Sequence, residues 1–265
     1  MNKWLSFFPI IIVLVLVAAA TGWFAENFYS NNVDSIAVKF RTYDLVLLSL
    51  ITPLSVVMLI LARSGQTWSK LFVIGILIYL AFSYGINVFN CYQNELFLVY
   101  IAIFSLCVFA TIMGLTDMAT SIKELSNLKL MKANSIILLL IAVSGYRFWL
   151  TDAIIALINK DVSPSIVGLT LPVNAAQVLD IGFMLPLTIF GAIKLWQSRP
   201  IGMLISAMML VFFMLISISV ITMEIGLKLS GFEIDSGKIY GFGTVMVLSL
   251  VMTFFTYRSL AKSSR

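Results

Sequence analysis

Eight separate segments of the 265-residue chain are apolar over about 20 residues, the length that an α-helix needs to cross a lipid bilayer. They cover residues 4–23, 44–62, 71–90, 95–115, 135–157, 174–195, 201–223 and 240–258. The chain is 61% hydrophobic and 11% charged, whereas soluble domains are about 25% charged. The sequence therefore predicts an all-α, polytopic membrane protein that forms one bilayer-embedded domain over residues 1–265.

The basic residues indicate how these segments are oriented. When the eight segments are threaded alternately, most of the 17 lysines and arginines fall on the side that holds both termini. They are Lys3, Arg63, Lys70, Lys123, Lys129, Lys132, Lys194, Arg199, Arg258, Lys262 and Arg265. The other side holds Lys39, Arg41, Lys160, Lys228 and Lys238. The positive-inside rule then predicts a multi-pass protein with both termini cytoplasmic. These loops also explain the net charge of +5, so no nucleic-acid partner is expected.

The two halves of the chain resemble each other. The stretches "DLVLLSLITPLSVVMLILAR" (44–63) and "DIGFMLPLTIFGAIKLWQSR" (180–199) each begin with Asp, contain a proline and end with Arg. "VLVAAATGW" (15–23) resembles "LLIAVSGY" (139–146). We expect two parallel four-helix repeats, residues 1–115 and 135–258. The basic start and small residues of the first segment also fit a cleaved signal peptide, but a counterpart in the fifth segment favours its retention.

Two charged residues lie inside the predicted spans. Arg147 falls beyond the middle of the fifth span, and Asp180 lies about two turns into the sixth. The two residues therefore come to a similar depth on the extracytoplasmic side. A lone charge in hydrocarbon costs at least about 2.5 kcal/mol. We expect an Arg147–Asp180 ion pair between adjacent helices.

Other polar residues share this depth and predict a binding site. The candidate residues are Asn87, Asn90, Tyr146, Arg147, Asp152, Gln177, Asp180 and Glu224, with Ser83, Ser144, Thr151 and Asn174 on the same helical faces. They predict a pocket open to the extracytoplasmic side and lined by the third, fifth and sixth spans. The alternative is structural: Ser and Asn stripes pack helices, span-end carboxylates lie among headgroups, and an ion pair can fix helix register.

Recognisable catalytic and cofactor motifs are absent from the sequence. The chain has no histidine, which excludes His-ligated haem and most zinc and copper sites. It contains neither a P-loop nor a G-x-G-x-x-G fingerprint, and its two cysteines, Cys91 and Cys107, do not form a CxxC motif. No catalytic residue, metal ligand or cofactor is therefore predicted.

Three stretches resemble a group of bacterial integral membrane proteins. "RTYDLVLLSLITPLSVVMLILARSG" has a Tyr-Asp pair opening a span, "LIYLAFSYGINVFNCYQNELFLVY" has a Tyr/Asn-rich span before an N-x-L-F-L-x-Y segment, and "VLDIGFMLPLTIFGAIKLWQSRP" ends in basic residues and proline. The similarity covers most of residues 41–205. As no activity is assigned to the group, the resemblance implies a bacterial inner-membrane location and transfers no functional residue.

Three functions fit these features. The first is a small-solute transporter or binding protein, in which Arg147 holds an anionic group and Asp180 holds the arginine or exchanges a proton. The second is a non-catalytic partner or sensor subunit whose polar cluster is structural. The third is a membrane-embedded enzyme that acts on a lipid or isoprenoid head group with Asp152, Asp180 or Glu224. The substrate and the oligomeric state are not predicted by the sequence.

Overall fold

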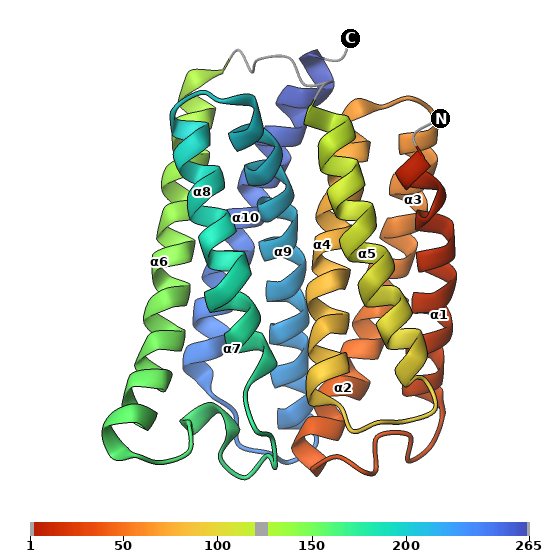
Figure 1. Ribbon diagram of the computed structural model, residues 1–265, viewed down its shortest axis with the longest axis vertical. Helices are drawn as coiled ribbons and strands as arrows, with labels where there is room; N and C mark the ends of the chain where they lie inside the picture. Colours follow the sequence, from red (N-terminus) through yellow and green to blue (C-terminus); the bar gives the residue numbers. More distant parts are fainter. Residues whose placement is uncertain (1–2, 120–126, 264–265) are drawn as a thin grey trace.

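The computed structural model describes residues 3–119 and 127–263, and helices account for nearly all of them (Figure 1). The elements are a 3-10 turn (Lys3–Ser6), α1 (Phe8–Phe24), α2 (Asp34–Val46), a π-helical segment η2 (Leu47–Ile51), α3 (Thr52–Arg63), α4 (Thr67–Asn90), α5 (Phe97–Ala119), α6 (Leu128–Asn159), a 3-10 turn (Pro164–Ile166), α7 (Ala175–Leu179), a second π-helical segment η4 (Asp180–Met184), α8 (Leu185–Trp196), α9 (Pro200–Leu229) and α10 (Ser236–Ser263). Lys123 and Arg265 lie outside the described residues.

Eight helices in the described part of the chain are long and apolar enough to cross a membrane, which confirms the predicted number. α2, η2 and α3 form one continuous span, and so do α7, η4 and α8. The second span begins at Asp34 and not at residue 44, because α2 carries a polar first part that includes Lys39 and Arg41. The apolar run thus marks the membrane-crossing length correctly but underestimates the helix.

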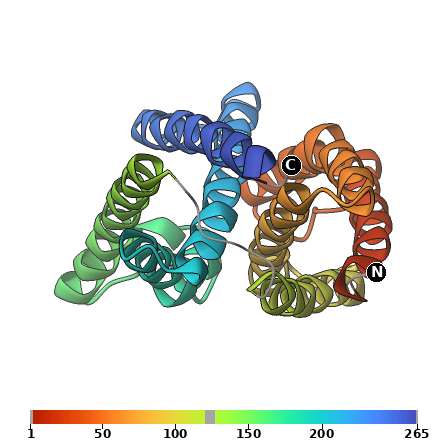
Figure 2. The ribbon, with the colours of Figure 1, turned by 90° about the horizontal axis from the view of Figure 1, so that it is seen from above.

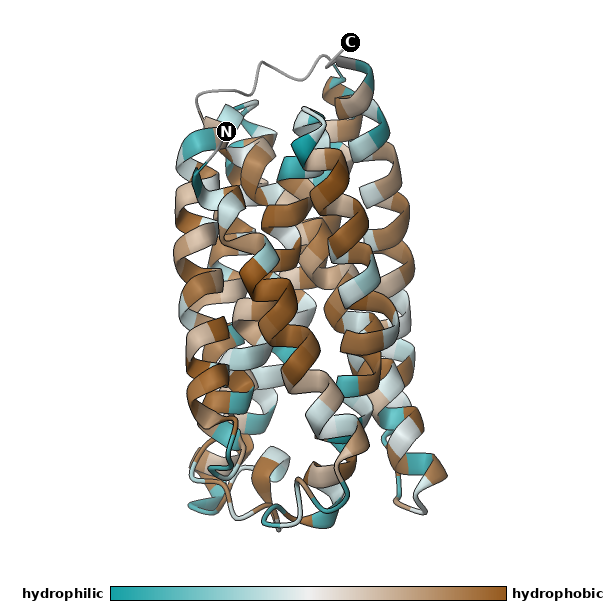
Figure 3. Cartoon of the chain, turned by 90° about the vertical axis from the view of Figure 1, so that its right-hand side faces the viewer, coloured by the Kyte–Doolittle hydropathy of each residue, from teal (hydrophilic) through white to brown (hydrophobic). Residues whose placement is uncertain are grey.

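The outer surface of the bundle is apolar along its middle (Figure 3). Large hydrophobic side chains point outward from the peripheral spans. They include Ile10, Val13, Val17, Val57, Ile60, Phe109, Ile112, Leu140, Val143, Phe190, Val247 and Phe254. An exposed apolar belt of this extent is unfavourable in water and matches a lipid environment. The structure is therefore typical of a multi-pass membrane protein.

Helices α4 and α9 form the centre of the bundle and are its most buried spans (Figure 2). Gly75 permits their close approach, since a Cβ atom there would lie 2.6 Å from Cβ of Val211. Farther along the same interface the hydroxyls of Tyr79 and Ser219 share a 2.7 Å hydrogen bond. The remaining spans surround this pair: α3, α5 and α7 pack on α4, while α2, α8 and α10 pack mainly on α9. α1 lies outside them against α2 and α5, and α6 lies against α8.

The second and sixth spans have the same local irregularities in the same order. Each contains a five-residue π-helical segment followed by an X-Pro step, Thr52–Pro53 in one and Leu185–Pro186 in the other. Behind each proline a hydroxyl donates to a carbonyl one turn earlier: Ser55 to Ile51 and Thr188 to Met184. Each span then ends in a turn with a residue at positive φ, at Gly65 and at Ser198.

These irregularities give a register that differs from the sequence match. The π-helical segments and the prolines occur at a constant offset, which places Asp180 opposite Leu47 and not opposite Asp44. At this offset Asp44 corresponds to Gln177, whereas the sequence match pairs Asp44 with Asp180. The carboxylates of Asp44 and Asp180 belong to different sites, as described below.

Candidate functional site

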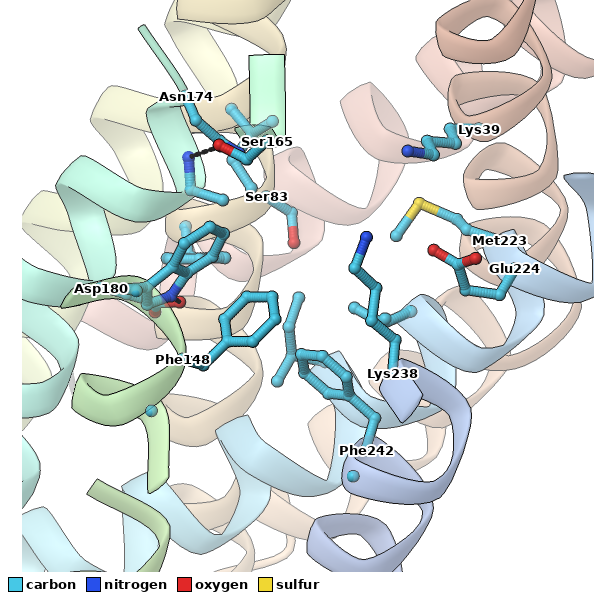
Figure 4. Close-up of a pocket in the computed structure, with 18 of the residues that line it drawn as sticks. Lys39, Ser83, Phe148, Ser165, Asn174, Asp180, Met223, Glu224, Lys238 and Phe242 are labelled. Atoms are coloured by element: carbon cyan, nitrogen blue, oxygen red, sulfur yellow. Dashed lines mark hydrogen bonds between the residues drawn. The ribbon is translucent and has the colours of Figure 1, made fainter. Parts of the chain in front are cut away.

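A cavity of about 600 Å³ lies between helices α2, α4, α6, α7, α9 and α10, toward the end of the bundle opposite the termini (Figures 1 and 4). Its volume is in the range of small-molecule binding pockets, about 300–1,000 Å³. The predicted walls from the third, fifth and sixth spans are all present. Three further spans, the second, seventh and eighth, complete the lining.

The described lining of the pocket includes five charged side chains: Lys39, Asp180, Glu224, Asp235 and Lys238. Lys39 of α2 and Lys238 of α10 extend toward it, and the buried Glu224 of α9 lies on the same side (Figure 4). Lys39 experiences attraction from Glu224 and repulsion from Lys238, so the three charges lie within electrostatic range of one another. Asp180 lies on the opposite wall. The pocket thus offers cationic and anionic groups to one occupant.

Most of the remaining lining is apolar and aromatic. Phe148 of α6 and Phe242 of α10 extend into the pocket (Figure 4), and Phe212 and Phe213 of α9 border it together with Ile141. Phe212 also packs edge-on against Phe82 of α4, at 5.2 Å between ring centroids. A mainly apolar cavity with a few polar groups is typical of a site for an organic molecule rather than for a small hydrated ion.

The expected Arg147–Asp180 ion pair is absent from the structure, so this prediction was wrong. The Asp180 carboxylate accepts a 2.7 Å hydrogen bond from the indole Nε1 of Trp149. Arg147 is exposed and does not line the pocket. Two residues along a helix correspond to a rotation of about 200°, so Trp149 and Arg147 point in nearly opposite directions. A similar depth was correctly inferred, but the direction around the helix was not.

Three other candidate residues form a hydrogen-bonded clamp beside the pocket. Gln177 donates from Nε2 to the backbone oxygen of Trp149 at 3.0 Å and to Asp152 Oδ2 at 3.2 Å. Asp152 also accepts from the Ser163 hydroxyl and from the backbone N–H of Ser165, the latter at 3.0 Å. Tyr146 donates to the backbone oxygen of Ile181 at 3.3 Å. None of these three residues lines the pocket. Their hydrogen bonds instead join α6 to α7, to the π-helical segment η4 and to the loop between α6 and α7.

The predicted asparagines do lie at the pocket. Asn87 is buried on α4 and lines it, and Asn90, one turn later, accepts from the backbone N–H of Ala175 at 3.3 Å. Asn174 also lines the pocket and caps α7, accepting from Ala176 N at 3.0 Å. Ser83 also lines the pocket, but its hydroxyl is buried beside the hydroxyls of Tyr43 and Tyr79. The polar lining of this wall therefore comes mainly from the asparagines.

Sequence reasoning did not identify the lysines. Lys39 and Lys238 were counted as loop charges, because both precede their apolar runs. Lys39 lies well inside α2, and Lys238 lies in the first turn of α10. The spacing of Lys39 and Tyr43, one helical turn apart, was the available signal, as both line the pocket.

A second buried polar group occupies the first half of the chain, away from the pocket. Asp44 is 3% exposed and accepts a 2.6 Å hydrogen bond from the Tyr29 hydroxyl. Burial, together with the nearby Asp44 carboxylate, raises the pKa of Tyr29 well above its usual value. Gly22 makes room for this pair, because a Cβ there would overlap the Asp44 carboxylate. The tyrosine therefore remains a proton donor throughout the physiological pH range.

The candidate site gives no evidence for a metal. No group of three or more His, Cys, Asp or Glu side chains is arranged to hold an ion within residues 3–119 and 127–263. In comparisons with known proteins, no family model, no curated protein and no solved structure matches the chain. The fold and the pocket define a helical, multi-pass membrane protein with an internal cavity, and the geometry of that cavity carries the functional argument.

Proposed function

We propose that this protein binds or transports an organic ligand in the pocket between α2, α4, α6, α7, α9 and α10. The observation that carries the proposal is the convergence of Lys39, Lys238 and Glu224 on one end of a largely apolar cavity. Two ammonium groups that repel each other favour an occupant that places an anionic group between them. The asparagine wall provides hydrogen bonds on the opposite side.

The proposed setting is a bacterial cytoplasmic membrane, with both termini in the cytoplasm and the pocket toward the extracytoplasmic side. Two arguments support it: the excess of basic residues at the end that holds the termini, and the resemblance to bacterial integral membrane proteins. The matched π-helical segments, prolines and positive-φ turns support two parallel four-helix repeats, related by an axis between α4 and α9. In this arrangement a transport cycle would rock one half against the other along the α4–α9 interface.

Cysteine accessibility tests the pocket and its orientation together. Ile216→Cys places a thiol in the pocket, and Val247→Cys places one on the lipid-facing side of α10. Both are made in a Cys91→Ser background, since Cys91 is the partly exposed natural thiol. A membrane-impermeant methanethiosulfonate added outside spheroplasts should modify the residue 216 thiol and spare that at 247. Modification at 216 only after exposure of the cytoplasmic face would overturn the proposed orientation.

Loss of a co-purified compound tests binding directly. Small molecules extracted from the purified protein are identified by mass spectrometry. Ile216→Trp fills the cavity, whereas Val247→Trp adds the same side chain outside it. A compound present with the parent and the 247 variant and absent from the 216 variant would support a binding pocket. Equal retention by both variants would contradict it.

A further inference from the structure

The pocket has a polar end and an apolar end, arranged along the direction of the helices. Lys39, Asp180 and Glu224 each lie within six residues of a helix end on the pocket side, a depth of about 9 Å at 1.5 Å per residue. Ile141 and Phe212 line the other end and lie about 25 Å from the same ends of α6 and α9. The charged level thus matches a headgroup layer, and the apolar level matches acyl chains.

The pocket also has an opening, here called the gap, between α6 and α10, where exposed residues of both helices line it: Ser144 and Phe148 on α6 and Gly241 on α10. These two helices are joined near the end that holds the termini, where Asn134 Nδ2 donates to Thr256 Oγ1 at 2.8 Å. Away from this contact α6 packs on α8 and α10 packs on α9, and the two diverge (Figure 2). Along the diverging part both helices line the pocket, through Phe148 on one side and Phe242 on the other.

Gly241 leaves this gap unfilled on the α10 side. It lines the pocket one helical turn after Gly237, where a Cβ would lie 3.0 Å from Oδ1 of Asp235. A Cβ at Gly241 would meet no atom within 4 Å, so packing inside the protein does not explain the missing side chain. Gly243 has equally open surroundings but lies off the pocket. The gap therefore connects the cavity with the space that lipid occupies around the bundle.

We propose that the ligand is an anionic lipid with hydroxyls in its head group, such as phosphatidylglycerol, which enters sideways between α6 and α10. This inference rests on the proposed binding function and adds the ligand class and the route. The phosphate lies between Lys39 and Lys238, and the head-group hydroxyls donate to Glu224 and Asp180. One acyl chain fills the apolar end beside Phe212, and the other remains in the bilayer through the gap.

The experiment measures lipid occupancy of the full-length protein by native mass spectrometry after reconstitution in phosphatidylcholine nanodiscs. Phosphatidylglycerol is titrated in one arm, and water-soluble glycerol phosphate, the same head without chains, in the other. The double variant Lys39→Gln/Lys238→Gln should weaken phosphatidylglycerol binding about tenfold or more, since it removes both cationic partners of the phosphate. Gly241→Leu should weaken it comparably by filling the gap, and the matched Gly243→Leu should leave it unchanged.

The outcomes separate this inference from the function on which it rests. Glycerol phosphate binding with no preference for phosphatidylglycerol would overturn the lipid and the side entrance while leaving a binding pocket in place. Equal phosphatidylglycerol binding by all the variants would place the lipid on the outer surface and overturn the inference. If neither compound binds, the lipid inference fails. If the residue 216 thiol is also inaccessible from outside, the proposed function fails with it. Thermal unfolding identifies any variant that does not fold. If Gly241→Leu does not fold, Lys39→Gln/Lys238→Gln still tests whether phosphatidylglycerol binds in the pocket.

Discussion

Asp180 accepts its 2.7 Å hydrogen bond from the indole of Trp149, while Arg147, two residues earlier on the same helix, points away from it. The carboxyl group at the pocket wall is thus held by a neutral donor from α6. The contact also fixes α6 against the start of the sixth span, next to the π-helical segment that begins at Asp180.

The first prediction concerns this contact. Trp149→Phe removes the indole N–H and leaves the Asp180 carboxyl group without this hydrogen-bond donor. The loss should lower the free energy of unfolding by about 1–3 kcal/mol. Arg147→Ala removes an exposed side chain and should change it by no more than about 0.5 kcal/mol. Both are measured by denaturant unfolding in the same detergent. A loss on Arg147→Ala as large as that on Trp149→Phe would show that the arginine stabilises the fold after all.

The second prediction concerns Tyr29 and pH. Burial and Asp44 raise the pKa of Tyr29, so the folded protein holds this proton more tightly than the unfolded chain. Its contribution to stability is fully present below the ordinary tyrosine pKa, about 10, and is lost as the pH rises toward the raised value. Stability should therefore fall with alkaline pH less steeply in Tyr29→Phe than in the parent protein. At neutral pH the Tyr29→Phe variant should be less stable than the parent by about 1–3 kcal/mol. If the free energy of unfolding fell equally steeply with pH in both proteins above pH 10, the prediction would be wrong.

The third prediction uses two glycines with opposite surroundings. A Cβ at Gly22 would overlap the Asp44 carboxylate, so Gly22→Ala should destabilise the protein by about 1–3 kcal/mol. Gly243→Ala adds the same methyl group to a helix where nothing lies within 4 Å, and it should stabilise by about 0.5–1 kcal/mol. Thermal unfolding distinguishes the two signs. Equal effects would mean that Gly22 does not pack against Asp44.

The fourth prediction concerns topology. Cysteines introduced at Gln66 and Leu128 should react with a membrane-impermeant maleimide only from the cytoplasmic face, and a cysteine at Ser230 only from outside. Burial raises the pKa of the natural Cys91 thiol to about 11, so that it stays protonated and reacts slowly at neutral pH. Labelling of positions 66 and 230 from the same side would exclude the eight-span arrangement.

Hydropathy predicted the spans because length and apolar content are enough to identify a membrane-crossing helix. The pocket was partly predicted for the same reason: Asn87, Asn90, Asp180 and Glu224 had to lie near one level, and all four line or border it. Level alone does not specify which way a side chain points. Tyr146, Arg147, Asp152 and Gln177 were assigned to the site on depth, and the structure places none of them in the lining.

The lysines were missed for a different physical reason. An apolar run ends where side chains become polar, but the helix continues, since its backbone hydrogen bonds do not depend on the lipid. Lys39 and Lys238 lie on these polar extensions, where a basic residue is usually only an interfacial charge. Only the packing of six helices reveals that both extensions turn toward the same cavity.

The π-helical segments have a consequence for chain length. Each wide turn accommodates one residue more than an α-helix would, so the part of the span before it is rotated by about 100° relative to a regular helix. Deleting a single residue within Leu47–Ile51 would turn Asp44 away from Tyr29. The same deletion within Asp180–Met184 would swing Gln177 away from Trp149 and Asp152. A one-codon deletion in either place would thus leave a span of sufficient length to cross the membrane but facing the wrong neighbours.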